Sequence, residues 1–189
     1  MAEDFTTVFL RELQANPAAV LGAIVLPAAG GVYGSRITRA NLKTWYAKLN
    51  KPWFNPPNYL FPPVWMILYT LSGFASYLIW KEDHIWPLVP YAISIITNNL
   101  WTPLFFGFHL LNLALLDLLV LWVSLASCIA LFHPINELAA MLLLPYIAWV
   151  SFAGVLNFSI LLKNPSTKPS SAAAAATTSD AGASQKKQQ

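Results

Sequence analysis

Residues 52–80, PWFNPPNYLFPPVWMILYTLSGFASYLIW, carry no charged side chain between Lys51 and Lys81. An apolar helix of about 20 residues crosses the roughly 30 Å hydrocarbon core of a bilayer. The second part of this stretch therefore predicts a membrane-spanning helix near Asn58–Trp80. The first part is rich in proline and predicts a stiff loop, because each proline fixes its own backbone and biases the preceding residue towards extended structure.

Four more apolar stretches, uncharged apart from Asp117, lie along the rest of the chain. They predict helices near Pro17–Ser35, Trp86–Phe108, Asn112–Phe132 and Leu138–Leu162. Strands of a transmembrane barrel alternate apolar and polar residues over about 10 positions, and these runs do not alternate. We therefore predict an all-α, multi-pass membrane protein with a bundle of five transmembrane helices.

The composition supports a membrane location. Hydrophobic residues make up 57% of the chain and charged residues only 10%, against about 25% charged residues in a soluble domain. The net charge is +3, but the basic residues cluster at predicted helix ends, where they favour contact with membrane lipid rather than with nucleic acid. The single cysteine, Cys128, and three scattered histidines predict neither a disulfide nor a metal site.

The chain divides into three parts. Residues 1–15 form an N-terminal extension, which is acidic at its start and lacks the basic region of a cleaved signal. Residues 16–163 form the transmembrane domain, in which the first loop, about 36–57, is expected to act as a lid. Residues 164–189 are rich in Pro, Ser, Thr and Ala and are predicted to form a disordered tail.

The basic residues also predict an orientation. The side that holds the first loop and the tail carries Arg36, Arg39, Lys43, Lys48, Lys51, Lys163 and Lys168, whereas the other side carries only Arg11 and Lys81. Because lysine and arginine are enriched on the cytoplasmic side of membrane proteins, we expect a cytosolic C-terminus.

Gly30 and Gly34 have the small-xxx-small spacing that lets two helix backbones approach closely. This spacing predicts that the first helix packs against another helix, either inside the same bundle or in a second protomer.

Polar and aromatic residues recur at helical spacing on three predicted helices. Facing one another, such stripes would suit a large, mostly apolar ligand with few polar groups. Alternatively, the aromatics fill the core and the asparagines join helices. The candidate residues are Trp65, Tyr69, Ser72 and Ser76 on the second helix, Asn98, Trp101 and Phe105 on the third, and Tyr146, Trp149, Ala153 and Asn157 on the fifth.

Asp117 stands alone in a leucine-rich run. A proton relay needs further ionisable groups at membrane depth, and the other predicted helices offer none. We therefore expect Asp117 to make a structural hydrogen bond.

Ordered motifs along the chain resemble the translocator proteins, also called tryptophan-rich sensory proteins or peripheral benzodiazepine receptors. The matches run in order from Gly30 to Asn157. They are Trp45-Tyr46-Ala47, Lys51-Pro52, Pro56-Pro57, Trp65 with Leu68-Tyr69, Trp80-Lys81, Asn98 with Trp101, Phe105-Phe106-Gly107, Asp117 and Pro145-Tyr146 with Trp149 and Asn157.

The resemblance implies a receptor or carrier of the outer mitochondrial membrane, not an enzyme, that serves lipid transport. It implies binding of sterols such as cholesterol, porphyrins and benzodiazepine-type drugs in a pocket under the first loop. No resident cofactor is expected, and porphyrin or haem would be a ligand. The expected ligand-binding residues are Trp45, Trp65, Tyr69, Asn98, Trp101, Tyr146, Trp149, Ala153 and Leu156.

Two departures from the family pattern affect these expectations. The sterol-recognition segment, with expected contacts at Phe152, Phe158 and Lys163, has Phe158 where the family has tyrosine. Val89 and Ile93 stand where small residues of a dimer motif are expected, so a homodimer remains one alternative. Two further functions also remain open: light-dependent porphyrin breakdown at Trp65 and Trp149, and a structural partner role.

Overall fold

A computed structural model describes residues 4–165, and in this range the chain forms helices and connecting loops without strands. The all-helical prediction is confirmed for this range. In chain order the elements are α1 (Phe5–Ala15), α2 (Pro17–Leu42), α3 (Trp45–Lys48), the 3₁₀ turn η1 (Asn58–Leu60), α4 (Phe61–Lys81), α5 (Leu88–Thr102), the π-helical turn η2 (Pro103–Gly107), α6 (Leu111–Phe132), α7 (Glu137–Leu142) and α8 (Leu144–Lys163).

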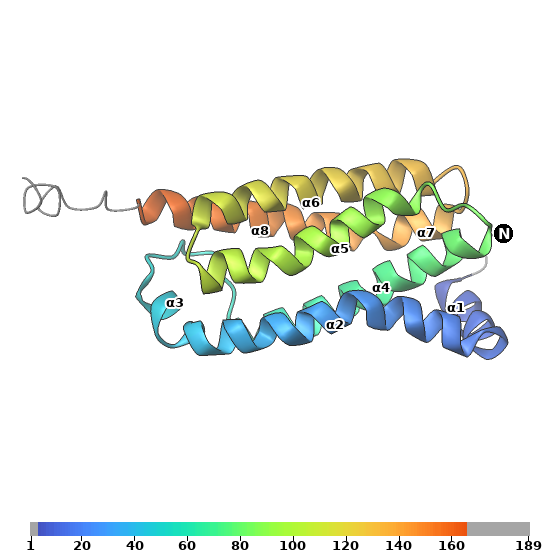
Figure 1. Cartoon of the computed structure of the whole chain (residues 1–189), viewed down its shortest axis with the longest axis horizontal. Helices are drawn as coiled ribbons and strands as arrows, with labels where there is room; N and C mark the ends of the chain where they lie inside the picture. Colours follow the sequence, from blue (N-terminus) through green and yellow to red (C-terminus); the bar gives the residue numbers. More distant parts are fainter. Residues whose placement is uncertain (1–3, 166–189) are drawn as a thin grey trace, which may run out of the picture.

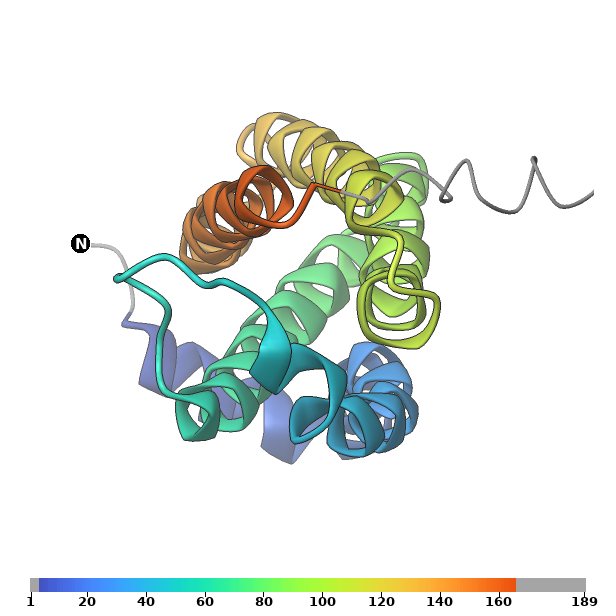
Figure 2. The same ribbon diagram turned by 90° about the vertical axis from the view of Figure 1, so that its left-hand side faces the viewer.

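Five helices, α2, α4, α5, α6 and α8, lie along the long axis of the molecule (Figure 1). The segment that contains α3 lies at one end of this bundle, and α1 and α7 lie at the other. Figure 2 looks along the bundle and shows the α3 segment crossing its end face between α2 and α8. The bundle thus has a covered end, where the first loop packs, and an opposite end, where the N-terminal helix packs.

Four helical segments are long and apolar enough to cross a membrane: Pro17–Leu42, Asn58–Lys81, Leu111–Phe132 and Glu137–Lys163. The predicted third helix is the exception. Its α-helical part, α5, has only 15 residues, and the chain continues as the π-helical turn η2. Pro103 lacks a backbone N–H and cannot continue the regular hydrogen-bond pattern; instead Phe108 N–H donates to Pro103 O at 2.8 Å.

Glycines fix how closely α2 packs. A Cβ on Gly73 of α4 would lie 2.6 Å from both Ala23 O and Ile24 Cα, so the backbones of α2 and α4 touch there. On the next face of α2, Gly30 lies against the Asn99 side chain of α5, and Gly34 lies against Thr102. The predicted small-residue contact therefore occurs inside the bundle.

The structure differs from the sequence prediction at the end of the first predicted helix and in the N-terminal extension. The first predicted helix continues beyond Ser35 to Leu42, so the first loop begins at Lys43; residues 43–57 are called the lid below. The N-terminal extension contains α1, which begins after Asp4, whose side chain accepts the Thr7 N–H at 2.7 Å. Apart from Asn164 and Pro165, the predicted tail lies outside the described residues.

Candidate functional site

The predicted stripes on α4, α5 and α8 face one another inside the bundle. Tyr69 Oη donates to Asn98 Oδ1 at 3.0 Å, which joins α4 to α5. The Trp65 ring meets the Tyr146 ring edge-on at 6.1 Å, which joins α4 to α8. Trp101, Trp149 and Ala153 pack on the same apolar cluster, which includes Leu68, Leu118, Leu121 and Val150. The 3.6-residue period located this cluster because inward-facing residues of a helix recur every three or four positions.

An apolar cleft opens on the side of the bundle between α4 and α8. Its volume is about 380 Å³, within the range of roughly 300–1,000 Å³ typical of small-molecule sites. It is lined by Val64, Ile67 and Leu68 of α4 and by Pro145, Ala148, Trp149 and Phe152 of α8. Two of the predicted contact residues, Trp149 and Phe152, therefore line one continuous apolar surface.

The lid packs against the end of this region. Phe54 meets Phe152 at a ring distance of 6.3 Å, and Phe61, at the start of α4, meets Trp149 at 5.8 Å. Trp45 stacks on His109 at 4.0 Å and contacts Phe105 edge-on at 5.7 Å. The lid thus touches the aromatic residues beside the cleft through Phe54, while Trp45 anchors it to the segment after α5.

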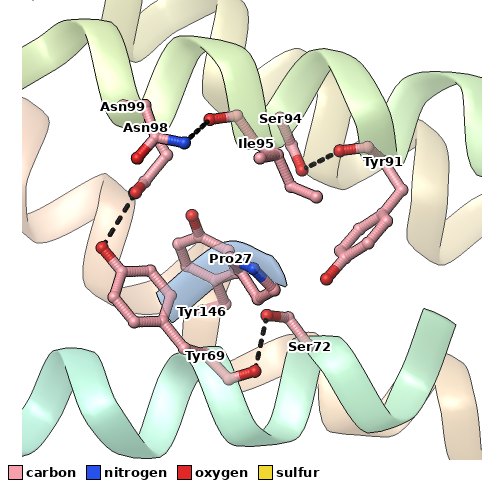
Figure 3. Close-up of a pocket in the computed structure, with 9 residues that line it drawn as sticks. All are labelled: Pro27, Tyr69, Ser72, Tyr91, Ser94, Ile95, Asn98, Asn99 and Tyr146. Atoms are coloured by element: carbon pink, nitrogen blue, oxygen red, sulfur yellow. Dashed lines mark hydrogen bonds between the residues drawn. The ribbon is translucent and has the colours of Figure 1, made fainter. Parts of the chain in front are cut away.

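A second, polar cavity lies deeper, among α2, α4, α5 and α8 (Figure 3). It has room for about one water molecule. Tyr69, Tyr91 and Tyr146 surround it together with serine and asparagine side chains. Tyr91 Oη and Asn99 Oδ1 are buried without a hydrogen-bond partner among the described residues. A cavity of this size does not hold a polycyclic ligand.

The remaining predicted residues lie in different surroundings. Leu156 is buried against the lid residue Tyr46 and the η2 aromatics Phe105 and Phe106. Phe158 and Lys163 lie on the outer surface of the bundle, away from the cleft. Asn157 serves to join helices, because its Nδ2 donates to Leu111 O of α6 at 2.9 Å. Trp53 is 96% exposed, so this side chain of the lid points outward.

Asp117 is nearly buried on α6, and its Oδ2 has no hydrogen-bond partner in residues 4–165. The predicted structural hydrogen bond is therefore wrong for the described part of the chain.

The residues that the sequence analysis missed share one feature. Val64, Leu68, Ala148 and Phe54 are plain apolar residues, and apolar residues line cores and lipid-facing surfaces alike. The spacing of Val64 and Leu68 on α4 and of Ala148 on α8, at three and four positions from other cleft residues, places them beside the predicted tryptophans. This spacing could have located them once the two helices were known to splay apart at the lid end.

Together, these features define an all-helical membrane protein with a lid over one end of its bundle and an apolar cleft at its side. The TspO/MBR family profile matches residues 23–162, and the chain belongs to this family. It is 39% identical over 150 residues to a translocator protein of Bos taurus, a match that covers 76% of this chain and 89% of that protein.

Bacterial and archaeal proteins are similar to a comparable degree. A tryptophan-rich protein TspO of Chlorobaculum tepidum is 38% identical over 142 residues, which cover 72% of this chain and 90% of that protein. A tryptophan-rich protein TspO of Archaeoglobus fulgidus is 37% identical over 150 residues, which cover 77% of this chain and 96% of that protein. The matched family region begins after α1, so α1 lies outside it.

Proposed function

We propose that this protein is a receptor or carrier for apolar polycyclic ligands, with sterols, porphyrins and benzodiazepine-type drugs as the ligand classes. The observation that carries the proposal is the apolar cleft between α4 and α8, lined by Trp149 and Phe152 and closed at one end by Phe54 of the lid. A flat apolar ligand buries its faces against such aromatic walls. Trp65, Tyr69 and Tyr146 form the layer directly behind the cleft.

The proposal includes five membrane crossings. Taken together, α5 and η2 cover Leu88–Gly107, which at 1.5 Å per residue corresponds to about 30 Å, enough for one crossing. In this proposal, which adds α5 and η2 to the other four segments, the lid and the end of α8 lie on the same side of the membrane.

The proposed membrane is the outer mitochondrial membrane, with the lid end in the cytosol. Arg36, Arg39, Lys43, Lys48, Lys51 and Lys163 gather at that end, whereas Lys81 at the opposite end is paired with Glu12. Protease added to intact mitochondria should therefore cut the chain beyond Lys163. A C-terminus that stays protected while the outer membrane is intact contradicts the orientation.

Ligand binding is tested with the purified full chain in lipid nanodiscs, titrated with protoporphyrin IX and, separately, with cholesterol. Truncating a well-buried aromatic contact costs about 1–3 kcal/mol, so Trp149→Ala should weaken binding about 5- to 150-fold. Trp122→Phe is the control, because Trp122 lies on the outer side of α6, where its Nε1 donates to Ser151 Oγ at 2.9 Å. Loss of binding in Trp122→Phe, together with unchanged binding in Trp149→Ala, would contradict the assignment of ligand binding to this cleft.

The same titration under illumination distinguishes the receptor from a porphyrin-degrading protein. A receptor returns the porphyrin unchanged after unfolding, whereas a degrading protein yields a new absorbing product that is lost in Trp149→Ala. Because Trp149 lines the cleft, both activities would use the same surface.

A further inference from the structure

A reciprocal pair of amide hydrogen bonds joins the lid to the end of α8. Asn50 N–H donates to Asn164 Oδ1 at 3.0 Å, and Asn164 Nδ2 donates to Asn50 O at 3.0 Å. One side chain thus satisfies both backbone groups of a lid residue, as a neighbouring strand would. Asn50 Nδ2 adds a longer bond to Lys163 O at 3.5 Å. Asn164 lies beyond the part of the chain that matches the family.

The Asn164 side chain is held in this orientation by α8 itself. Its Nδ2 also donates to Ile160 O at 2.8 Å, and its backbone N–H donates to the same carbonyl at 3.0 Å. All three hydrogen-bonding positions of the amide group that face protein are therefore used. The lid is bound to a fixed point on a membrane-spanning helix rather than to a mobile side chain.

The lid is connected internally, so that Asn50 cannot move alone. Lys51 Nζ donates to Tyr46 O at 2.7 Å and to Leu49 O at 2.9 Å. Tyr46 Oη donates to Asn55 Oδ1 at 2.8 Å, which joins the start of the lid to its far side. Phe54, the residue before Asn55, is the one that meets Phe152 beside the cleft. A displacement of Asn50 therefore carries Phe54 with it.

We propose that Asn164 is a latch that holds the lid closed and so sets how long a ligand stays in the cleft. This inference rests on the proposed function. Trp45, which stays packed between Phe105 and His109, is the pivot, and the Asn50–Asn164 contact is the side that opens. Opening exposes the Phe152 end of the cleft. A force or partner acting on the chain directly after Asn164 would reach the lid through this contact.

The test compares Asn164→Ala with Asn50→Ala in the full chain in nanodiscs. Asn164→Ala removes both 3.0 Å bonds, whereas Asn50→Ala removes only the 3.5 Å bond and keeps the backbone pair. Loss of two hydrogen bonds at a partly solvated site corresponds to about tenfold faster release of protoporphyrin IX, with Asn50→Ala within about twofold of the wild type. Asn164→Leu, which keeps the branched shape but loses the acceptor and both donors, serves if Asn164→Ala does not fold.

Hydrogen exchange of residues 45–57 without ligand gives an independent reading. Exchange of the Asn50 amide should become faster in Asn164→Ala and Asn164→Leu, both of which lack its acceptor, with α4 unchanged. Unchanged exchange in both variants overturns the latch. Faster exchange with unchanged porphyrin release overturns its control of the ligand. If the wild type binds neither porphyrin nor sterol, the proposed function fails, while the exchange measurement still decides whether Asn164 holds the lid.

Discussion

Lys81 Nζ lies 2.7 Å from Glu12 Oε1 and 2.8 Å from Glu12 Oε2, and this ion pair ties α1 to the end of α4 opposite the lid. The carboxylate also accepts Tyr77 Oη at 2.9 Å, and Glu12 is only 3% exposed. On the same side of α1, Phe9 meets Phe74 edge-on at 5.0 Å. The N-terminal helix is therefore part of the folded bundle, held by the Lys81 ion pair, the Tyr77 hydrogen bond and the edge-on contacts of Phe5 and Phe9 with Phe74.

Replacing Glu12 should destabilise this end of the protein in a pH-dependent way. Hydrogen bonding by Lys81 lowers the pKa of Glu12 below its ordinary value of 4.5. A lowered pKa means that the carboxylate stabilises the fold above about pH 4.5 and that this stability is lost as the pH falls through the folded-state value. Glu12→Gln should lower the thermal midpoint at pH 7, and the difference from the wild type should shrink in acid. A difference that does not depend on pH contradicts the ion-pair role.

Tyr69→Phe and Tyr91→Phe should have opposite outcomes, although both remove one buried hydroxyl. Tyr69 Oη donates to Asn98 Oδ1, so its loss leaves that acceptor unsatisfied and costs about 1–3 kcal/mol. Tyr91 Oη has no partner in the described part of the chain, so its removal should be neutral or stabilising. Thermal unfolding in detergent measures both. Equal losses of thermal stability in the two variants would show that Tyr91 has a hydrogen-bond partner, such as a bound water in the polar cavity.

Gly73→Ala should weaken the contact between α2 and α4. The new Cβ would lie 2.6 Å from the backbone of Ala23 and Ile24, which cannot move aside as a side chain could. Overpacking of this kind costs about 1–3 kcal/mol. Gly154→Ala on α8 is the matched control, because nothing lies within 4 Å of its Cβ position, and alanine favours helix there by up to about 1 kcal/mol. Comparable losses of thermal stability in Gly73→Ala and Gly154→Ala would disprove the close approach of the α2 and α4 backbones.

Lys51→Met should loosen the lid without unfolding the bundle. Lys51 Nζ donates to the carbonyls of Tyr46, Ala47 and Leu49 and lies 4.8 Å from the centre of the Tyr46 ring. Methionine keeps much of the apolar stem but cannot donate, so hydrogen exchange across residues 45–55 should become faster. Lys48→Met is the control, since Lys48 is exposed and makes no hydrogen bond within the described residues. The prediction fails if hydrogen exchange across residues 45–55 is equally fast in Lys51→Met and Lys48→Met.

The amino-acid sequence determined the helices and their inward faces. Uncharged runs such as Asn58–Trp80 must be helical in a membrane, because only a helix satisfies its own backbone there. The spacing of Trp65, Tyr69, Tyr146 and Trp149 then placed these side chains on facing surfaces, since the helical period is a local property. The sequence did not predict that the third helix changes to a π-helical turn at Pro103, because the cost of a proline depends on whether the chain can form an alternative turn.

The tertiary structure decided which distant residues meet. The contact of Asn50 with Asn164 spans 114 positions and that of Glu12 with Lys81 spans 69, and neither follows from any repeat in the sequence. The cleft has the same origin: Trp149 and Phe152 on α8 face Val64 and Leu68 on α4 across an open space only because these helices diverge towards the lid. Hydrophobic patterning specifies which side of a helix is buried, but the crossing angles between helices, which tertiary packing sets, decide where a bundle stays open.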